Sequence, residues 1–484
     1  MIFSHERRFL KAFRVFESLL RFMQEAERQD MRIDLVERQT LAKLFEMGHA
    51  FSHEYIARCG AGDLGETLDE GGRTLRRLEL HPRRYVSIFG EHLFDRYVYA
   101  QREGQKIERA PVDERLGLPD GEFSYVLQDW LQRFCIKESF HEAGQSLQTL
   151  LGLRVSVRTA EHMNQHLAEH AEEFRVSQPP PDPEQEAELL VYANDCKGVP
   201  MRRPVEERAQ RGPRRGKGEK ANRKQMACVG AGYSVDRHVR TPDDVLDELF
   251  RRQSAVDRPQ PQNKRLWAEM TQLREGESYN GKARVFAQQA LDLQARDPRR
   301  KRTVVCLTDG EKALRQEQHE WLPRAIGVLD VWHVTERLWD VAYCFHAEQS
   351  PGAARFVEDR LRGLLEGKVG YVIGYFRRLL ATEQLTAAHR KTIRSTLVYF
   401  ENNRAYMKYD EYLAAGYPIG SGVAEGACRH VVKDRMELTG MRWTVAGAQS
   451  VLHLRAIYLN DDWDAYLESY IENEQDRLYR KAAA

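Results

Sequence analysis

The residues best suited to chemistry lie in segment 417–440, which reads YPIGSGVAEGACRHVVKDRMELTG. A Gly-Ser-Gly turn precedes a predicted helix there, and we expect the Ser421 hydroxyl to cap the first turn of that helix. Glu425, Arg429 and Lys433 recur at intervals of four, so they share one helix face. A carboxylate followed by two cations suits a divalent metal ion beside a phosphate. A solvated helix with ordinary ion pairs is the alternative reading.

Aspartates follow three apolar runs that we interpret as strands. Residues 189–193 lead to Asp195, residues 302–308 lead to Asp309, and segment 325–333 carries Asp330. Strands buried on both faces and separated by helices indicate an α/β layer. Ligands of open α/β sheets bind beyond the carboxyl ends of the strands, so we expect these acids to lie near a ligand.

These acids favour a metal site with oxygen ligands. Mg²⁺ prefers carboxylates and substrate phosphates, so Asp195, Asp309 and Glu425 are candidates to hold two ions, Mg²⁺ or Mn²⁺. One ion would activate a water or a 3′-hydroxyl, and the other would stabilise the leaving oxygen of an in-line displacement at phosphorus. No side-chain nucleophile is required.

The N-terminal part is predicted to be mainly helical. Residues 1–75 show apolar positions at helical spacing, which indicates amphipathic helices for self-association or packing. Residues 76–123 alternate like a small antiparallel sheet. Residues 124–178 fit a helix-turn-helix whose second helix would place Arg158 and His162 near a DNA groove. A plain pair of packed helices fits the same pattern.

Segment 179–183, PPPDP, is the clearest domain boundary. We assign 185–333 to the first part of an α/β core, 334–416 to an all-α insertion and 417–484 to the C-terminal helices of the core. A basic loop, 201–224, interrupts the first part. Its bases would follow a phosphate backbone, although a solvated loop is the alternative; they include Arg214, Arg215, Lys217 and Lys220.

Composition limits the class of protein. The chain has 484 residues and a net charge of +1, so overall charge predicts no polyanionic partner and any basic surface must be local. Its seven cysteines form no C-x-x-C pair, which favours a reducing compartment over a disulfide framework or a zinc site. No apolar run approaches the roughly 20 residues of a membrane span. We therefore expect a soluble cytoplasmic protein without a membrane partner.

Several motifs taken together resemble the DDE transposases of bacterial insertion sequences, most closely the ISKra group. The motifs are DCKGVP (195–200), CLTDG (306–310), LDVWHVTERLW (329–339), the segment 401–436 that contains PIGSGVAEGACRH, and GMRW (440–443). The resemblance covers most of the chain.

The resemblance implies an RNase H-like core with Asp195, Asp309 and Glu425 as metal ligands. It also implies DNA cleavage at the element's terminal inverted repeats, transfer of the 3′ ends into target DNA, and an assembly of at least a dimer. Asp330 and His333 match a signature of the similar Mutator-like transposases, where they would support the site or contact DNA. Trp443 would stack on an unpaired base or pack in the core.

Two other functions fit the same residues less completely. A non-catalytic DNA-binding regulator would use the helix-turn-helix and keep the α/β core as a scaffold. A structure-specific RNase H-like nuclease would cleave without defined ends. The complete acidic set favours the transposase.

Overall fold

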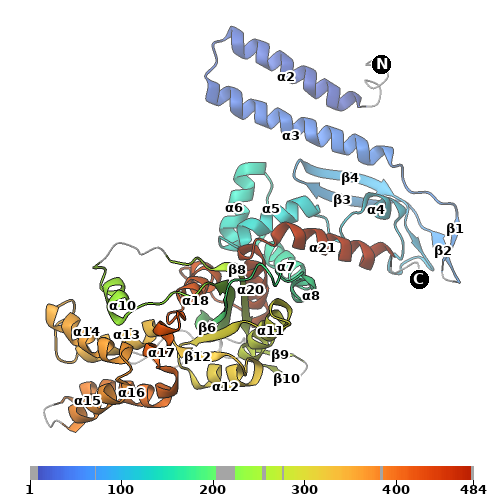
Figure 1. Cartoon of the computed structure of the whole chain (residues 1–484). Coiled ribbons are helices and arrows are strands. Elements are labelled where there is room, and N and C mark those ends of the chain that lie inside the picture. Colours follow the sequence, from blue (N-terminus) through green and yellow to red (C-terminus); the bar gives the residue numbers. More distant parts are fainter. Residues whose placement is uncertain are drawn as a thin grey trace, which may run out of the picture. The chain divides into compact units, whose positions relative to one another are not determined.

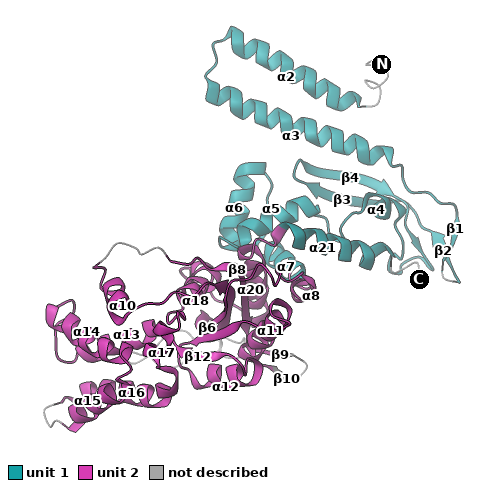
Figure 2. Cartoon of the chain, viewed as in Figure 1, with its two compact units in different colours: residues 1–167, 464–484 teal, residues 168–463 magenta. Residues whose placement is uncertain are grey.

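The structure is a computed structural model that describes residues 9–70, 72–202, 224–252, 258–274, 277–381 and 385–480 (Figure 1). The chain divides into two compact units (Figure 2). Residues 1–167 and 464–484 form unit 1, and residues 168–463 form unit 2. The last 21 residues therefore group with unit 1, whereas the sequence interpretation placed all of 417–484 in the core.

Unit 1 begins with a helical hairpin and a small β region. The elements are α2 (Leu10–Arg28), α3 (Ile33–Arg58), β1 (Thr67–Glu70), β2 (Arg73–Arg77), β3 (His81–Ser87), β4 (Gly90–Arg96), β5 (Tyr99–Ala100) and α4 (Pro111–Leu116). Strands β3 and β4 pair as an antiparallel hairpin, and β1, β2 and β5 form a second antiparallel sheet. The predicted sheet is thus present as two small sheets.

The predicted helix pair of unit 1 is confirmed. It comprises α6 (Phe140–Leu151) and α7 (Val157–Leu167), which pack with α5 (Tyr125–Cys135). Ser139 and Glu142 form a capping box at the start of α6, and Gly152 ends it in a left-handed conformation with φ 71°. Helix α21 (Trp463–Gln475) and the π-helix η3 (Asp476–Arg480) complete this part of the chain.

Unit 2 is built on a five-stranded mixed sheet, which confirms an α/β architecture. The strands are β6 (Leu189–Pro200), β7 (Lys224–Val235), β8 (Gln262–Met270), β11 (Thr303–Thr308) and β12 (Ile326–Leu329). Their order is β12-β11-β6-β7-β8. Strands β6, β7 and β8 pair antiparallel, and β11 runs parallel to both β6 and β12.

Strand β6 is longer than the sequence indicated. It pairs with β7 from Leu189↔Val235 to Pro200↔Lys224. Asp195 therefore lies inside the strand, opposite Val229, and the prediction that the strand ends at this residue is wrong. The hairpin partner supplies backbone hydrogen bonds along the whole segment, so the polar residues after Ala193 stay extended.

Helices cover both faces of the sheet. On one face, Leu189, Val191 and Ala193 share a core with the helices that follow β12. These are α13 (Val331–Ala342), α14 (Pro351–Leu365), α15 (Val369–Ala381), α16 (Ala387–Asn403), the 3₁₀ helix η1 (Arg404–Tyr406) and α17 (Tyr409–Ala414). The described part of the predicted all-α insertion is thus helical, and it is fused to the sheet by this common core.

On the other face, Leu190 and Tyr192 pack with Phe286 of α11 (Gly281–Arg296).

The remaining elements of unit 2, on either face or at the edges of the sheet, are α8 (Ala171–Ser177), α10 (Pro242–Leu249), β9 (Gln272–Arg274), β10 (Glu277–Tyr279), α12 (Lys312–Trp321), α18 (Gly422–Ala427), the π-helix η2 (Cys428–Lys433), α19 (Asp434–Met436) and α20 (Val445–Leu459). Among the described residues, no helix is long and apolar enough to cross a membrane.

A buried carboxylate holds α20 against the sheet. Glu269 of β8 accepts hydrogen bonds from Gln449 at 2.9 Å and from Arg175 at 3.1 Å, and it lies 3.1 Å from His453 Nε2. Burial opposes ionisation of Glu269, but His453 and the neighbouring arginines hold the pKa of this carboxyl well below its usual range. His453 is thus a bonded histidine inside the core.

Candidate active site

Two of the predicted acidic ligands lie side by side on adjacent parallel strands. Asn194 of β6 is paired in register with Thr308 of β11; Asp195 is the next residue of β6, and Asp309 directly follows the end of β11. Both aspartates are half-buried. The chain thus brings together two carboxylates that are 114 positions apart in the sequence.

Asp309 is held by its own turn and by the helical insertion. Its Oδ1 accepts the Glu311 N–H at 2.7 Å, and its main-chain oxygen accepts the Tyr399 hydroxyl at 2.7 Å. Burial raises the pKa of the Asp309 carboxyl, and the negative charge of Asp195 raises it further. A cation between the two carboxylates would relieve their electrostatic repulsion, so this pair is a suitable environment for a metal ion.

Asp330 lies at the end of β12 and begins α13. Its Oδ1 accepts the Trp332 N–H at 2.8 Å, so it caps the helix, and its Oδ2 accepts the Ser421 N–H at 3.2 Å. The side chain is buried, and burial raises the pKa of its carboxyl. Of the two roles left open for Asp330, support of the site matches this position.

The sequence placed Trp332 and His333 on the β12 strand, which is wrong. Both lie on α13, because the Asp330 cap starts the helix there. Trp332 is 38% exposed rather than part of the core. His333 lies 3.3 Å from Glu336, one helical turn along.

Ser421 has a different role from the predicted one. It occupies the N-cap position of α18, but its side chain caps no N–H of that helix. Instead the hydroxyl donates a hydrogen bond to the buried carboxylate oxygen Oδ2 of Asp330. The Ile419 main-chain oxygen accepts the Val331 N–H at 2.9 Å, so this bond and the two from Ser421 to Asp330 join segment 419–421 to the start of α13.

Glu425 is on α18, which packs against β6 and β7. Its side chain is exposed. Across the described residues, no group of three or more His, Cys, Asp or Glu side chains is arranged to hold a metal ion. The structure thus brings Asp195 and Asp309 together but does not assemble Glu425 with them as a third ligand.

A π-helix changes the predicted spacing of the basic residues after Glu425. Residues Cys428–Lys433 form η2, so Arg429 and Lys433 do not continue the α-helical face. Arg429 lies 3.7 Å from Asp434. Lys433 is exposed, and within the described parts of the chain it has no carboxylate partner.

A polar cavity of about 580 Å³ adjoins Asp309. His333, Arg337 and Tyr399 line it together with Asp309, and the Arg337 guanidinium lies 5.3 Å from the centre of the Tyr399 ring. No local pattern points to Tyr399, because it is 90 positions from Asp309 and contacts it only through the fold. Asp309 and His333 therefore share one cavity, and Asp330, the predicted partner of His333, is not among the residues that line it.

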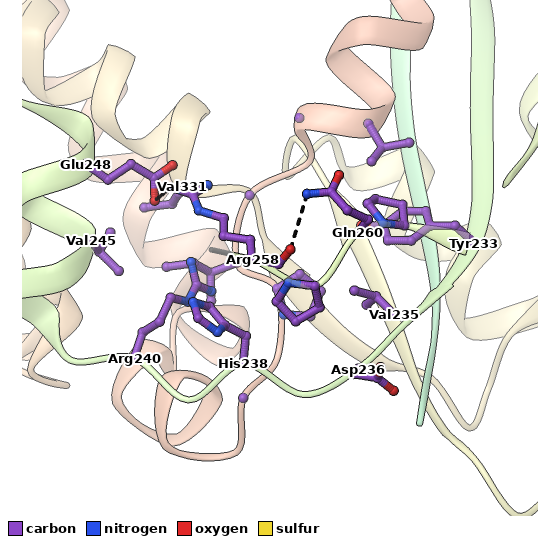
Figure 3. Close-up of a pocket in the computed structure, with 18 of the residues that line it drawn as sticks. Tyr233, Val235, Asp236, His238, Arg240, Val245, Glu248, Arg258, Gln260 and Val331 are labelled. Carbon is purple, nitrogen blue, oxygen red and sulfur yellow. Dashed lines mark hydrogen bonds and ion pairs between the residues drawn. The ribbon is translucent and has the colours of Figure 1, made fainter. Parts of the chain in front are cut away.

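A second cavity of about 330 Å³ lies beside the Gly-Ser-Gly turn (Figure 3). It is lined by apolar residues such as Tyr233 and Val331, and by Arg240 and Arg258. Arg258 forms an ion pair of 2.5 Å with Glu248, and Gln260 Nε2 donates to the Arg258 main-chain oxygen at 3.2 Å. Sequence reasoning did not find this cavity, because its lining comes from four separate segments.

The predicted DNA contacts occupy different environments. Arg158 and His162 are exposed on α7. Trp443 is buried: its Nε1 donates to the Met436 oxygen at 3.1 Å, and the Arg435 guanidinium lies over its ring. Core packing is thus the alternative that describes Trp443. Four predicted contacts lie outside the described residues: Arg214, Arg215, Lys217 and Lys220.

The donor set fits the predicted ions. Asp195 and Asp309 offer hard carboxylate oxygens, the ligands that Mg²⁺ and Mn²⁺ prefer.

Neither a scan against protein-family models nor a search of curated proteins found a match for this chain.

Proposed function

We propose that the chain is a DDE-class transposase, which cleaves DNA at the ends of an insertion element and transfers the 3′ ends to target DNA. The observation that carries this proposal is the adjacency of Asp195 and Asp309 on parallel strands. The nearby Gly-Ser-Gly turn, which begins the helix of Glu425, adds to it.

The sheet supports an RNase H-like core for this enzyme. Three antiparallel strands followed by two parallel strands, in the spatial order third, second, first, fourth, fifth, form the arrangement expected of that fold. The first of these strands contains Asp195, and Asp309 directly follows the fourth. The fold alone does not assign an activity, so the proposal depends on the carboxylates.

In this proposal Asp195 and Asp309 would hold divalent ions, and Glu425, which is exposed on α18, would be the third ligand. Bound ions would supply activation of a water or a 3′-hydroxyl and stabilisation of the leaving oxygen. Asp330 is a positioning residue, because it anchors the turn from which the Glu425 helix begins. Both bonds of Asp330 to Ser421 act on the backbone ahead of Glu425.

Exposed basic residues would bind the DNA backbone. Arg429 and Lys433 follow Glu425 on η2, and Arg158 lies on α7 of unit 1. His162, also exposed on α7, would contribute a hydrogen bond to the DNA. Cations of this kind neutralise phosphates and supply salt-dependent affinity.

Substitution of the acids tests the proposal. Asp195→Ala, Asp309→Ala and Glu425→Ala are each expected to abolish Mg²⁺-dependent cleavage while DNA affinity stays near that of the wild type. Glu320→Ala, at an exposed acid of α12, is the matched control and should cleave normally. Retained cleavage in Asp309→Ala would reject the assignment.

The substrate distinguishes the two alternatives. A nuclease of the same fold would cleave DNA that lacks terminal repeats at an equal rate. A regulator would bind a specific duplex and cleave it with neither metal. Cleavage confined to the repeat ends favours the transposase.

A further inference from the structure

The helical hairpin of unit 1 has little core of its own. Only Ala12 and Ala26 of α2 are buried apolar residues, and only Ala50 and Ile56 of α3. Nearly all the large apolar side chains of the two helices are therefore partly or largely exposed. Packing of an apolar face supplies most of the stability of helices, so this hairpin lacks a partner surface.

Most of the exposed apolar residues of the two helices follow a heptad pattern, and Leu10, Ile33 and Leu35 are exposed outside it. On α2 the spacing is three, four and three, and on α3 the positions fit the same repeat, with Gly48 at one of them. The exposed fractions range from 36% to 59%, and the residues are Phe13, Phe16, Leu20 and Met23 on α2 and Leu41, Leu44, Phe51 and Tyr55 on α3.

These two stripes adjoin along the hairpin and form one apolar face. Phe9 continues the α2 pattern, and its ring centre lies 5.6 Å from that of Phe51 on α3. Near the other end, Met23 Sδ lies 3.8 Å from the Thr40 hydroxyl. We call the eight exposed side chains the hairpin face.

The β3–β4 hairpin packs along α3 beside the hairpin face. His49 stacks on His92 of β4 with ring centres 4.4 Å apart, and Phe45 contacts Phe89 in the turn between the strands. Gly48, at its place in the α3 repeat, also faces Phe89, since a Cβ there would lie 2.5 Å from the Phe89 ring. The β hairpin thus reaches the edge of the hairpin face, and the eight side chains of that face remain exposed.

Charge and area indicate what covers the face. Residues 10–58 contain eight basic and eight acidic side chains, a balance that offers no attraction to nucleic acid or to an anionic membrane. Burying the eight side chains would remove roughly 600 Å² of apolar surface from each copy, and polar neighbours would add to it. A stable dimer needs about 800 Å² on each partner.

We propose that the hairpin face docks on the same face of a second copy, so that two α2–α3 hairpins form a four-helix bundle. A self-complementary patch of this kind produces a closed, two-fold dimer. Heptad stripes with exposed leucine and phenylalanine supply the interlocking side chains of such a bundle. This dimer requires neither DNA nor metal, so it does not depend on the proposed function.

Sedimentation of the full chain without DNA tests the inference. Wild type is expected to be a dimer at micromolar concentration, and Phe16→Glu and Leu41→Glu are each expected to weaken the dimer at least about tenfold, because each buries a charge. Leu291→Glu is the matched control, since Leu291 is a 57% exposed leucine on α11. It should sediment as the wild type does.

A milder variant, Phe16→Ala, guards against unfolding by the glutamate. With an unchanged circular dichroism spectrum, it should weaken the dimer several-fold. A wild type that stays monomeric at about 100 µM would overturn the inference and assign the face to another partner. A dimer unaffected by all three hairpin variants would overturn it as well.

Discussion

The Ser421 hydroxyl donates a hydrogen bond to Asp330 Oδ2, and the Ser421 N–H donates to the same oxygen at 3.2 Å, across 91 positions of sequence. Both residues are buried. The two bonds fasten the turn before the Glu425 helix to the cap of α13. Asp330, which holds no substrate itself, can thereby determine the position of the proposed catalytic residue Glu425.

Removal of this hydroxyl should affect both stability and cleavage. Ser421→Ala leaves the Asp330 oxygen with one donor fewer, and we expect unit 2 to lose about 1–3 kcal/mol of unfolding free energy. Cleavage should fall more than DNA binding does. Urea titration followed by tryptophan fluorescence measures the first effect, and a labelled duplex measures the second. Ser450→Ala is the control, because that hydroxyl bonds only to its own helix at Ala446. Equal effects in the two variants would remove the positioning role.

Much of the sheet could be predicted, because continuous apolar runs mark buried strands. Residues Thr303–Thr308 and Ile326–Leu329 were found in this way. The extent of β6 was not, because its last residues are extended only through pairing with β7. Sequence patterns report local preference, and this pairing is a long-range effect.

The site was predictable in its residues but not in its geometry. Asp195 and Asp309 were recognised because each acid follows an apolar run, although β6 continues past Asp195. The bond from Ser421 to Asp330 and the one from Tyr399 to Asp309 join distant segments, so no local pattern carries them. Trp332 was misplaced because an apolar run, VLDVW, spans the end of β12 and the start of α13.

Replacement of the Asp309 charge should stabilise the empty protein. The folded pKa of this carboxyl lies above its usual value, so ionisation costs stability at neutral pH, and the cost disappears as pH falls through that pKa. Asp309→Asn should therefore melt higher than wild type at pH 7 and lose this advantage in acid. Mg²⁺ should raise the melting temperature of wild type but not of the variant. A wild type indifferent to Mg²⁺ and Mn²⁺ would contradict a metal site here.

Acid should loosen α3 from the β3–β4 hairpin. Burial lowers the pKa of His92 to about 4, and the nearby His49 and His53 add to the effect. The unfolded histidine takes up its proton near pH 6.5, so stability falls as pH drops from there toward 4, by about 3 kcal/mol in full. Hydrogen exchange of peptides from α3 and β4 should accelerate over this range beyond the intrinsic pH effect. His92→Phe should remove the acceleration, and an unchanged profile in that variant would contradict the assignment.

Exposed cations should contribute to DNA affinity one phosphate at a time. Arg158→Ala and Lys433→Ala are each expected to weaken duplex binding and to reduce the slope of log affinity against log salt by about 1. Fluorescence anisotropy over a salt series measures this. Arg76→Ala is the control, because Arg76 is exposed on β2, outside the helix-turn-helix. A slope that falls equally in the control would assign the effect to general charge.

The central claim is tested most directly by cleavage of a labelled duplex that bears the candidate terminal repeat, with Mg²⁺ or Mn²⁺, by wild type and by Glu425→Gln. The variant keeps the size of the side chain and removes only the charge that a metal ligand needs. We expect metal-dependent nicking at the repeat in wild type and none in Glu425→Gln. Specific binding without cleavage by wild type, with both metals and with paired ends present, would contradict it and favour a regulator.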